Sequence, residues 1–330
     1  MSDWGIGLLD ETALRLLGGV VVILLIASAT AWVLGRKLGT TSTITNLKQR
    51  INAWWLMVAL IGAVLAAGET VAILLFLLLS LLALREFITI SPTGRGDHKV
   101  LVWLVFIIPA VHYWFVWEHW YGMFSVFIPV YAFLFLPARN ALAGQTKGFL
   151  HRSATIQWAL MVCVYAISHA PALLQLPVAM ELGRESAEGS SPGAGGATGA
   201  HLLLFLLIVV QGSDVLQYVW GKTLGRHPIA PTVSPNKTWE GFIGGVLSAT
   251  ALGAGLWWLT PFSPLVAAAF ALVSCVMGFA GGLVMSAIKR DRGIKDFGST
   301  IPGHGGIMDR LDSLCFAAPV FFHLVRFFYT

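Results

Sequence analysis

Two polar segments in the last third of the chain contain the residues whose types and spacing suit phosphate chemistry. The denser segment runs from Ser286 to Asp312 and mixes lysine, arginine, aspartate and histidine with several glycines. Its cations can neutralise phosphate oxygens. Asp309 and Asp312 lie three residues apart, which places both carboxylates on one face of a helix. Because carboxylates beside bound phosphates commonly hold Mg²⁺, the pattern predicts a metal-dependent site for a phosphorylated substrate.

The candidates in this segment have separate expected roles. Ser286 is expected to contact substrate, and Asp309 and Asp312 are expected to hold the metal. The glycines near the end of the segment allow a close backbone approach to a ligand or a positive φ. The simpler alternative is an ordinary polar loop, but such a loop needs no mixture of glycines, paired aspartates and cations. The candidate catalytic residues are Lys289, Arg290, Lys295, Asp296, His304 and Arg310.

The second polar segment is Ser234–Gly241. Ser234, Lys237 and Thr238 are expected to contact a triphosphate or another substrate group. The segment is not a P-loop, because the Gly-x-x-x-x-Gly that precedes Lys-Thr in that motif is absent. The alternative interpretation is a turn followed by a helix start, which Glu240 in a first helical turn would suit.

Asp214 lies within a long apolar run, where a carboxylate is costly and therefore indicates a functional site. We expect it to bind substrate. The alternative is a structural pairing with Lys222 or Arg226 near the end of the same run. Arg85 and Glu86 are expected to form a local ion pair at the end of another apolar run.

The elements that must position these residues are membrane helices. The 330 residues are 57% hydrophobic and 11% charged, whereas soluble domains carry about 25% charged residues. Runs of roughly 20 apolar residues can cross a bilayer. We therefore expect an all-α, polytopic integral membrane protein with about 10 transmembrane helices. The expected spans are 13–34, 52–68, 70–90, 100–118, 120–136, 154–177, 200–221, 241–260, 263–288 and 312–329.

Charge alternates between the two sides of the expected bundle. Most of the 21 lysines and arginines fall in alternate connections, whereas the opposite connections and the N-terminal segment are acidic. Because cytoplasmic loops are enriched in positive residues, we expect loops 222–240 and 289–311 at the cytoplasmic face of a bacterial inner membrane. Residues 1–199 then form N-terminal helices and residues 200–330 the catalytic region. The net charge of +5 comes with no basic patch interleaved with aromatics, so nucleic acid is not an expected partner.

The two polar segments together resemble the signature of the phosphatidate cytidylyltransferases, or CDP-diacylglycerol synthases. That signature is Ser, two residues, Lys-Arg, four residues, Lys-Asp, a small residue, then Pro, His-Gly-Gly and Asp-Arg-x-Asp. All its elements occur with the same spacing in Ser286–Asp312. The family's Ser-Pro-x-Lys-Thr-x-Glu-Gly run corresponds to Ser234–Gly241, and its preceding Asp and Tyr correspond to Asp214 and Tyr218. Residues before 200 match only as a set of hydrophobic spans.

The resemblance implies a reaction of CTP with phosphatidic acid that gives CDP-diacylglycerol and pyrophosphate, a step in phospholipid biosynthesis. It implies Mg²⁺ or another divalent cation, allows a second, monovalent cation, and suggests a homodimer among membrane lipids. Little covalent work would fall on the protein, which must position two anions and offset their repulsion.

Three other functions remain open. They are cytidylyl transfer to a different lipid phosphate or a polyprenol, membrane transport, and an inactive homologue. A transporter would place charges at the midplane of several helices, whereas these charges concentrate in two loops. An inactive homologue is considered because Gly281-Gly282 stands where the family usually has Gly-Asp, and that Asp is an expected metal ligand.

Overall fold

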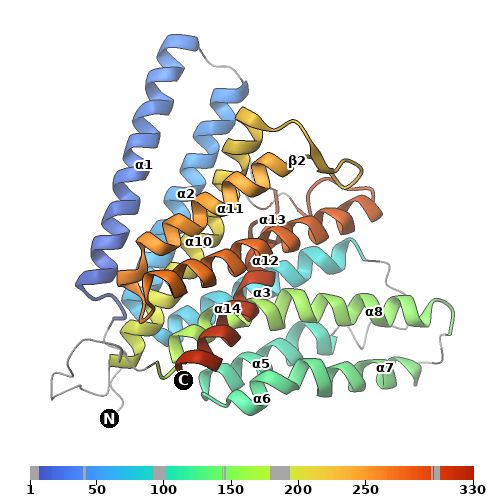
Figure 1. The fold of residues 1–330 in the computed structure, drawn as a ribbon. Helices are drawn as coiled ribbons and strands as arrows, with labels where there is room; N and C mark the ends of the chain where they lie inside the picture. The colour runs from blue at the N-terminus through green and yellow to red at the C-terminus, as the bar shows by residue number, and fades with distance from the viewer. Residues whose placement is uncertain are drawn as a thin grey trace.

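The computed structural model describes residues 7–39, 42–91, 102–142, 144, 146–178, 194–298, 300 and 305–330. These residues are helical apart from their connections and one short hairpin, which confirms the all-α class (Figure 1). The elements before residue 180 are α1 (Glu11–Leu38), α2 (Ser42–Ala67), α3 (Glu69–Thr89), η2 (Trp103–Ile107), α5 (Ile108–Trp117), α6 (Tyr121–Val126), η3 (Phe127–Ala132), α7 (Phe133–Ala141), α8 (Phe149–Leu160), η4 (Met161–Ala166), α9 (Ile167–Ala172) and η5 (Leu173–Gln175). Those after it are α10 (Ala194–Leu224), β1 (Pro228–Ala230), β2 (Ser234–Thr238), α11 (Trp239–Gly255), η6 (Trp257–Leu259), α12 (Pro264–Asp291), α13 (Met308–Leu311) and α14 (Leu314–Tyr329).

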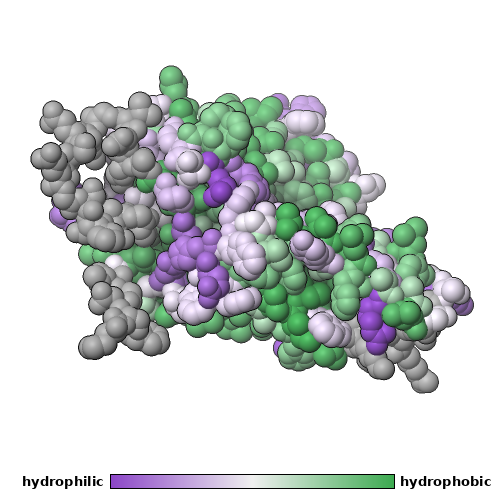
Figure 2. Space-filling view, turned by 90° about the horizontal axis from the view of Figure 1, so that it is seen from below, coloured by the Kyte–Doolittle hydropathy of each residue, from purple (hydrophilic) through white to green (hydrophobic). Residues whose placement is uncertain are grey.

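Apolar side chains cover much of the outer surface of this bundle. Seven helices in the described ranges are long and apolar enough to cross a membrane. Leu142, Leu265 and Phe327 are 82%, 83% and 81% exposed, and Figure 2 shows hydrophobic residues over much of one face. A water-soluble monomer rarely exposes so much apolar surface. The chain is therefore an integral membrane protein.

Helices occur where the ten spans were expected, but three of the runs are short. Trp103–Trp117 and α14 are apolar helices of fewer than 18 residues, and α11 has 17.

Side chains cap the starts of two long helices. The Asp10 carboxylate accepts a hydrogen bond from the Ala13 amide at 2.8 Å, and Ser263 caps α12 just before Pro264. A side-chain oxygen there satisfies an amide that has no partner within the helix.

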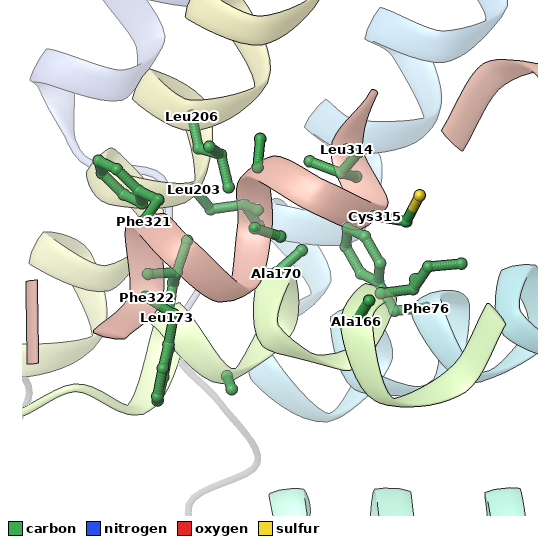
Figure 3. Packing of buried hydrophobic residues seen from close by; sticks show 14 of the residues in the cluster. Phe76, Ala166, Ala170, Leu173, Leu203, Leu206, Leu314, Cys315, Phe321 and Phe322 are labelled. Atoms are coloured by element: carbon green, nitrogen blue, oxygen red, sulfur yellow. The ribbon is translucent and has the colours of Figure 1, made fainter. Parts of the chain in front are cut away.

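A shared core joins the two halves of the chain. Figure 3 shows Phe76 of α3, Ala170 of α9, Leu203 of α10 and Phe321 of α14 within one cluster of buried apolar residues. Helix α14 thus packs against helices from both sides of residue 199. All three cysteines of the chain are buried and free, so no disulfide supports this core.

The hairpin formed by β1 and β2 connects α10 to α11, within the loop expected at 222–240. The two strands are antiparallel, with Pro228 opposite Thr238 and Ala230 opposite Ser234. Helix α11 packs closely on α10 because glycines face it: a Cβ at Gly245 would lie 2.3 Å from the Gln217 Cγ. This close packing fixes the position of the hairpin above the end of α12 (Figure 1).

Figure 1 shows where several connections lie. The hairpin and the end of α12 lie toward the upper right, the connection from α7 to α8 lies at the far right below them, and the C-terminus and the connection from α11 to α12 lie toward the lower left. The hairpin and the basic end of α12 thus lie on the opposite side of the view from the C-terminus.

Candidate active site

Asp214 and Asp312 lie together although 98 positions separate them in the chain. The Ser313 hydroxyl donates a hydrogen bond to Asp214 Oδ2 at 2.7 Å and also contacts Asp312 Oδ1 at 3.4 Å. The Ser313 amide donates to the same Asp312 oxygen at 2.8 Å. One oxygen of each carboxylate, Asp214 Oδ1 and Asp312 Oδ2, has no hydrogen-bond donor among the described residues. The pair therefore presents two open carboxylate oxygens.

Lys237 of β2 extends toward this pair. Its Nζ and Asp312 Oδ2 lie 2.8 Å and 3.8 Å from the point where a Cβ at Gly282 would be. Burial lowers the pKa of the Lys237 ammonium, while the Asp312 and Asp214 carboxylates oppose that shift. Among neighbouring charges, Asp312 acts most strongly on Asp214, Lys237 and Arg310. Asp312 is therefore the electrostatic centre of the site.

Asp309 faces a different set of partners. Its Oδ1 accepts a hydrogen bond from Lys289 Nζ at 2.7 Å, and both side chains of this ion pair are buried. Its Oδ2 accepts from the amides of Phe297 at 2.8 Å and Gly306 at 2.9 Å. Both oxygens of Asp309 are thus engaged in organising the loop that follows α12.

Glu86 of α3 is a site residue that sequence reasoning missed. Its Oε1 accepts hydrogen bonds from Thr300 Oγ1 at 2.7 Å and the Ile307 amide at 3.0 Å, and its Oε2 accepts from the Met308 amide at 2.9 Å. The expected ion pair with Arg85 is therefore wrong: the carboxylate turns inward to the start of α13, and Arg85 is exposed. The available sequence signal was an acid at the inner end of an apolar run.

Three glycines of the dense segment lie against these two carboxylates. A Cβ at Gly298 would lie 2.7 Å from Glu86 Oε1, and one at Gly306 would lie 2.3 Å from Glu86 Oε2. Gly305 has φ +81° and would bring a Cβ to 2.8 Å from Asp309 Oδ2. The close backbone approach expected for a ligand is thus observed around the protein's own acids.

Several candidate residues hold the framework of the site. Arg290 donates from Nε to the Val233 carbonyl at 3.2 Å and from Nη1 to the Ile294 carbonyl at 3.0 Å. This ties the end of α12 to the turn of the hairpin. The Ser286 hydroxyl donates to the Gly282 carbonyl at 2.7 Å.

The hairpin has its own supports. Thr238 Oγ1 accepts from the Gly241 amide at 3.1 Å and so caps α11. The Glu240 carboxylate accepts from the Arg226 amide at 3.0 Å and contacts His227. The expected helix start at this segment is present, and Ser234 lies half-buried beside it.

The remaining candidates differ in their exposure. Lys295 and Asp296 are exposed and have no hydrogen-bond partner in the part of the chain that the structure describes. Arg310 is half-buried, and its carbonyl accepts from Gln211 at 3.4 Å. His304 lies outside the described residues.

Arg50 of α2 is a second residue that the sequence did not single out. Its guanidinium lies 5.6 Å from the centre of the Tyr218 ring on α10, and its charge acts on Arg310. Two neighbouring guanidinium groups repel each other unless an anion lies nearby. The basic end of α2 thus adds a positive charge beside the site.

Comparison with known proteins shows the family of the chain. The model of the cytidylyltransferase family matches residues 48–328, which is most of the chain. The chain belongs to the cytidylyltransferase family. As a member it is a membrane-embedded nucleotidyltransferase that uses CTP.

Relatives of this cytidylyltransferase differ in how much of it they match. "Uncharacterized protein YnbB" of Escherichia coli K12 is 36% identical over 323 residues, 97% of this chain and 99% of that protein. A phosphatidate cytidylyltransferase of Mycobacterium leprae is 45% identical over 125 residues, 37% of this chain and 39% of that enzyme. One from Staphylococcus aureus strain COL is 39% identical over 124 residues, 37% of this chain and 48% of that enzyme. The matches to named enzymes cover less than half of those enzymes.

The family implies a divalent cation, and the three aspartates of this cytidylyltransferase differ in how well they could hold it. Hard cations take carboxylate oxygens as ligands, and Asp214 and Asp312 each present an open oxygen. Asp309 presents none, because Lys289 and two backbone amides already engage both of its oxygens. The donor set therefore favours Asp312 with Asp214, not Asp312 with Asp309.

Proposed function

We propose that the protein transfers the cytidylyl group of CTP to the phosphate of a lipid, with phosphatidic acid as the acceptor. The products are CDP-diacylglycerol and pyrophosphate. The observation that carries this proposal is the cluster of Asp214, Asp312 and Lys237 at the end of apolar helices. Such a cluster can bind a charged nucleotide from water beside a substrate whose acyl chains stay in the bilayer.

The bond changes of this reaction are simple. An oxygen of the lipid phosphate forms a bond to the α-phosphorus of CTP, and the bond from that phosphorus to the bridging oxygen breaks to release pyrophosphate. Both reactants are anions, so offsetting their repulsion is the main task of the site. A divalent cation, when bound, supplies positive charge to the phosphate oxygens and to the leaving pyrophosphate.

The residues of this chain divide the task. Asp312 and Asp214 would hold the cation through their open oxygens. Lys237, Lys295 and Arg310 would contact phosphate oxygens. We propose the same role for His304. Lys289 and Asp309 would keep the loop after α12 in place beneath the triphosphate, and Ser234, Thr238, Ser286, Arg290 and Asp296 would shape or line the pocket.

The orientation follows from the substrates. CTP is present in the cytoplasm, and the strand β2 that carries Lys237 lies near the basic end of α12 (Figure 1). We place this end at the cytoplasmic face of the bacterial inner membrane. Phosphatidic acid then enters sideways from the inner leaflet.

A different lipid phosphate is the second candidate acceptor. Named phosphatidate enzymes match only 37% of this chain, whereas the full-length relative carries no named substrate. The test is incubation of the purified protein with α-labelled CTP, Mg²⁺ and a panel of phosphatidic acid, polyprenyl phosphate and other lipid phosphates. We expect labelled CDP-diacylglycerol from phosphatidic acid. If another lipid becomes labelled and phosphatidic acid does not, phosphatidic acid is not the acceptor. If no lipid becomes labelled, the protein does not transfer the cytidylyl group.

Lys295→Gln is expected to raise the KM for CTP about tenfold with little change in kcat. The exposed Lys295 ammonium has no partner in the described chain and is therefore available to a phosphate of CTP. The variant would lose this one charge-assisted contact. Steady-state kinetics at low and high salt measure the effect, which salt should reduce. Lys147→Gln removes an exposed lysine elsewhere and serves as the control. Equal KM values for the two variants would exclude Lys295 from CTP binding.

A further inference from the structure

A cavity of about 820 Å³ lies between the end of α14 and the start of α6. Much of its wall is apolar and includes Leu324, Phe327 and Phe328, while Arg326 and His323 supply polar groups. No aspartate or glutamate is among the described residues that line it. Ligand pockets of this size commonly combine apolar walls with a few polar groups. The cavity therefore has the composition of a binding site for an amphipathic anion.

This cavity is separate from the candidate active site. Helix α14 begins at Leu314, directly after Asp312 and Ser313, and Arg326 lies in its last turn. Because a helix rises 1.5 Å per residue, Arg326 lies about 18 Å along α14 from Leu314. In Figure 1 the C-terminus lies on the opposite side of the view from the hairpin. An occupant of the cavity is thus distinct from a nucleotide bound beside Asp312.

Arg326 is placed to bind an anion. Its Cζ lies 3.4 Å from the centre of the Tyr121 ring, so the face of the guanidinium is covered by the ring. The five N–H donors of a guanidinium lie in its plane, and those of Arg326 have no hydrogen-bond or ion-pair partner in the described chain. A guanidinium held in this way can bind two phosphate oxygens at once.

His323 adds a second polar group and connects the cavity to the interior of the bundle. Its exposed ring lies 6.5 Å from the Tyr121 ring and 5.2 Å from the ring of buried His169. His169 Nδ1 donates to the Tyr165 carbonyl at 2.7 Å. Nε2 of the same ring is then an acceptor, and it is buried without a donor in the described chain. Because an unsatisfied buried acceptor is costly, a hydroxyl donor at this end of the cavity would be favourable.

We propose that this cavity binds a phospholipid of net negative charge, with the lipid phosphate on Arg326 and an acyl chain against Phe327 and Phe328. These two rings are 81% and 61% exposed. An acyl chain would remove their apolar surface from contact with its surroundings, whereas a free phosphate ion would leave it uncovered. A cation beside apolar side chains in the last turn of an apolar helix also suits the depth of lipid headgroups.

The test counts lipids bound to the full chain by mass spectrometry of the intact protein in detergent, titrated with phosphatidylglycerol or with phosphatidylcholine. We expect the wild type to bind phosphatidylglycerol at least about tenfold more tightly than phosphatidylcholine, because choline offsets the phosphate charge. Arg326→Gln should weaken phosphatidylglycerol binding at least about tenfold, through loss of a charge-assisted contact. Arg326→Lys keeps the charge and should bind phosphatidylglycerol more tightly than Arg326→Gln.

Arg15→Gln is the matched control, since the exposed Arg15 already pairs with Glu11 at 2.6 Å. It should keep the wild-type affinity for phosphatidylglycerol. Equal binding of phosphatidylglycerol by the wild type and Arg326→Gln would overturn the proposal. Excess inorganic phosphate should leave the bound lipid in place, and its displacement would show that the site takes free phosphate instead. No CTP is present, so these outcomes are independent of cytidylyl transfer.

Discussion

Asp312→Asn is expected to reduce cytidylyl transfer by at least about 100-fold and to weaken Mn²⁺ binding by a similar factor. Asp309→Asn is expected to reduce transfer as strongly but to weaken Mn²⁺ binding less than about tenfold. The difference follows from their partners. Asp312 presents an open oxygen at the centre of the site, whereas both oxygens of Asp309 are engaged by Lys289 and two amides.

The loss in Asp309→Asn would come from the loop. Lys289 and Asp309 form a buried ion pair at 2.7 Å, and removing one partner of such a pair costs about 3–5 kcal/mol. The new side-chain amide would also bring an NH₂ donor next to three existing donors, the Lys289 ammonium and the amides of Phe297 and Gly306. Asp291→Asn, at an exposed aspartate of the same helix end, is the matched control and should keep both activity and Mn²⁺ affinity. Equal loss of Mn²⁺ binding in Asp309→Asn and Asp312→Asn would restore Asp309 as a metal ligand.

Glu86→Gln is expected to reduce kcat by about 10- to 100-fold, although Glu86 lies on α3, far in sequence from the signature. The carboxylate accepts three hydrogen bonds from Thr300, Ile307 and Met308. A glutamine offers one oxygen and an NH₂ group, so at least one buried donor loses its acceptor, at a cost of about 1–3 kcal/mol. Because α13 begins at Met308, the change would displace the residues around Asp309 and Asp312.

Arg85→Gln distinguishes this explanation from a local ion pair. Arg85 is exposed and adjacent to Glu86, so an important ion pair between them would make both variants equally harmful. We expect Arg85→Gln to retain near wild-type kcat and thermal stability. Hydrogen exchange of the amides at Ile307 and Met308 should be faster in Glu86→Gln alone. Unchanged exchange and activity in that variant would show that Glu86 does not position the site.

The sequence alone predicts the membrane class and the positions of the helices well. Apolar runs of sufficient length need no tertiary information to be recognised, and the signature at Ser286–Asp312 has fixed spacing. The sequence also predicts that the two polar segments belong to one site, because both follow apolar runs that end on the same side. The structure adds that Asp214 reaches this site through Ser313.

What the sequence could not show is which acceptor oxygens are already occupied. The spacing of Asp309 and Asp312 predicts a shared face, yet the amides of Phe297 and Gly306 engage Asp309 Oδ2 and Lys289 engages its Oδ1. The sequence suggested only a local ion pair for Glu86, because its true partners lie more than 200 positions away. Such contacts depend on the packing of α3 against α13, which no local pattern encodes.

The most direct test of the central claim identifies which phosphate of CTP is transferred to the lipid. The purified protein in phosphatidic acid vesicles is given CTP labelled on the α-phosphate or on the γ-phosphate, with Mg²⁺. We predict that the α-label enters the lipid product in a one-to-one ratio with released pyrophosphate, and that the γ-label appears only in pyrophosphate. Transfer of the γ-label to lipid, or no α-label in any lipid, would contradict cytidylyl transfer at this site.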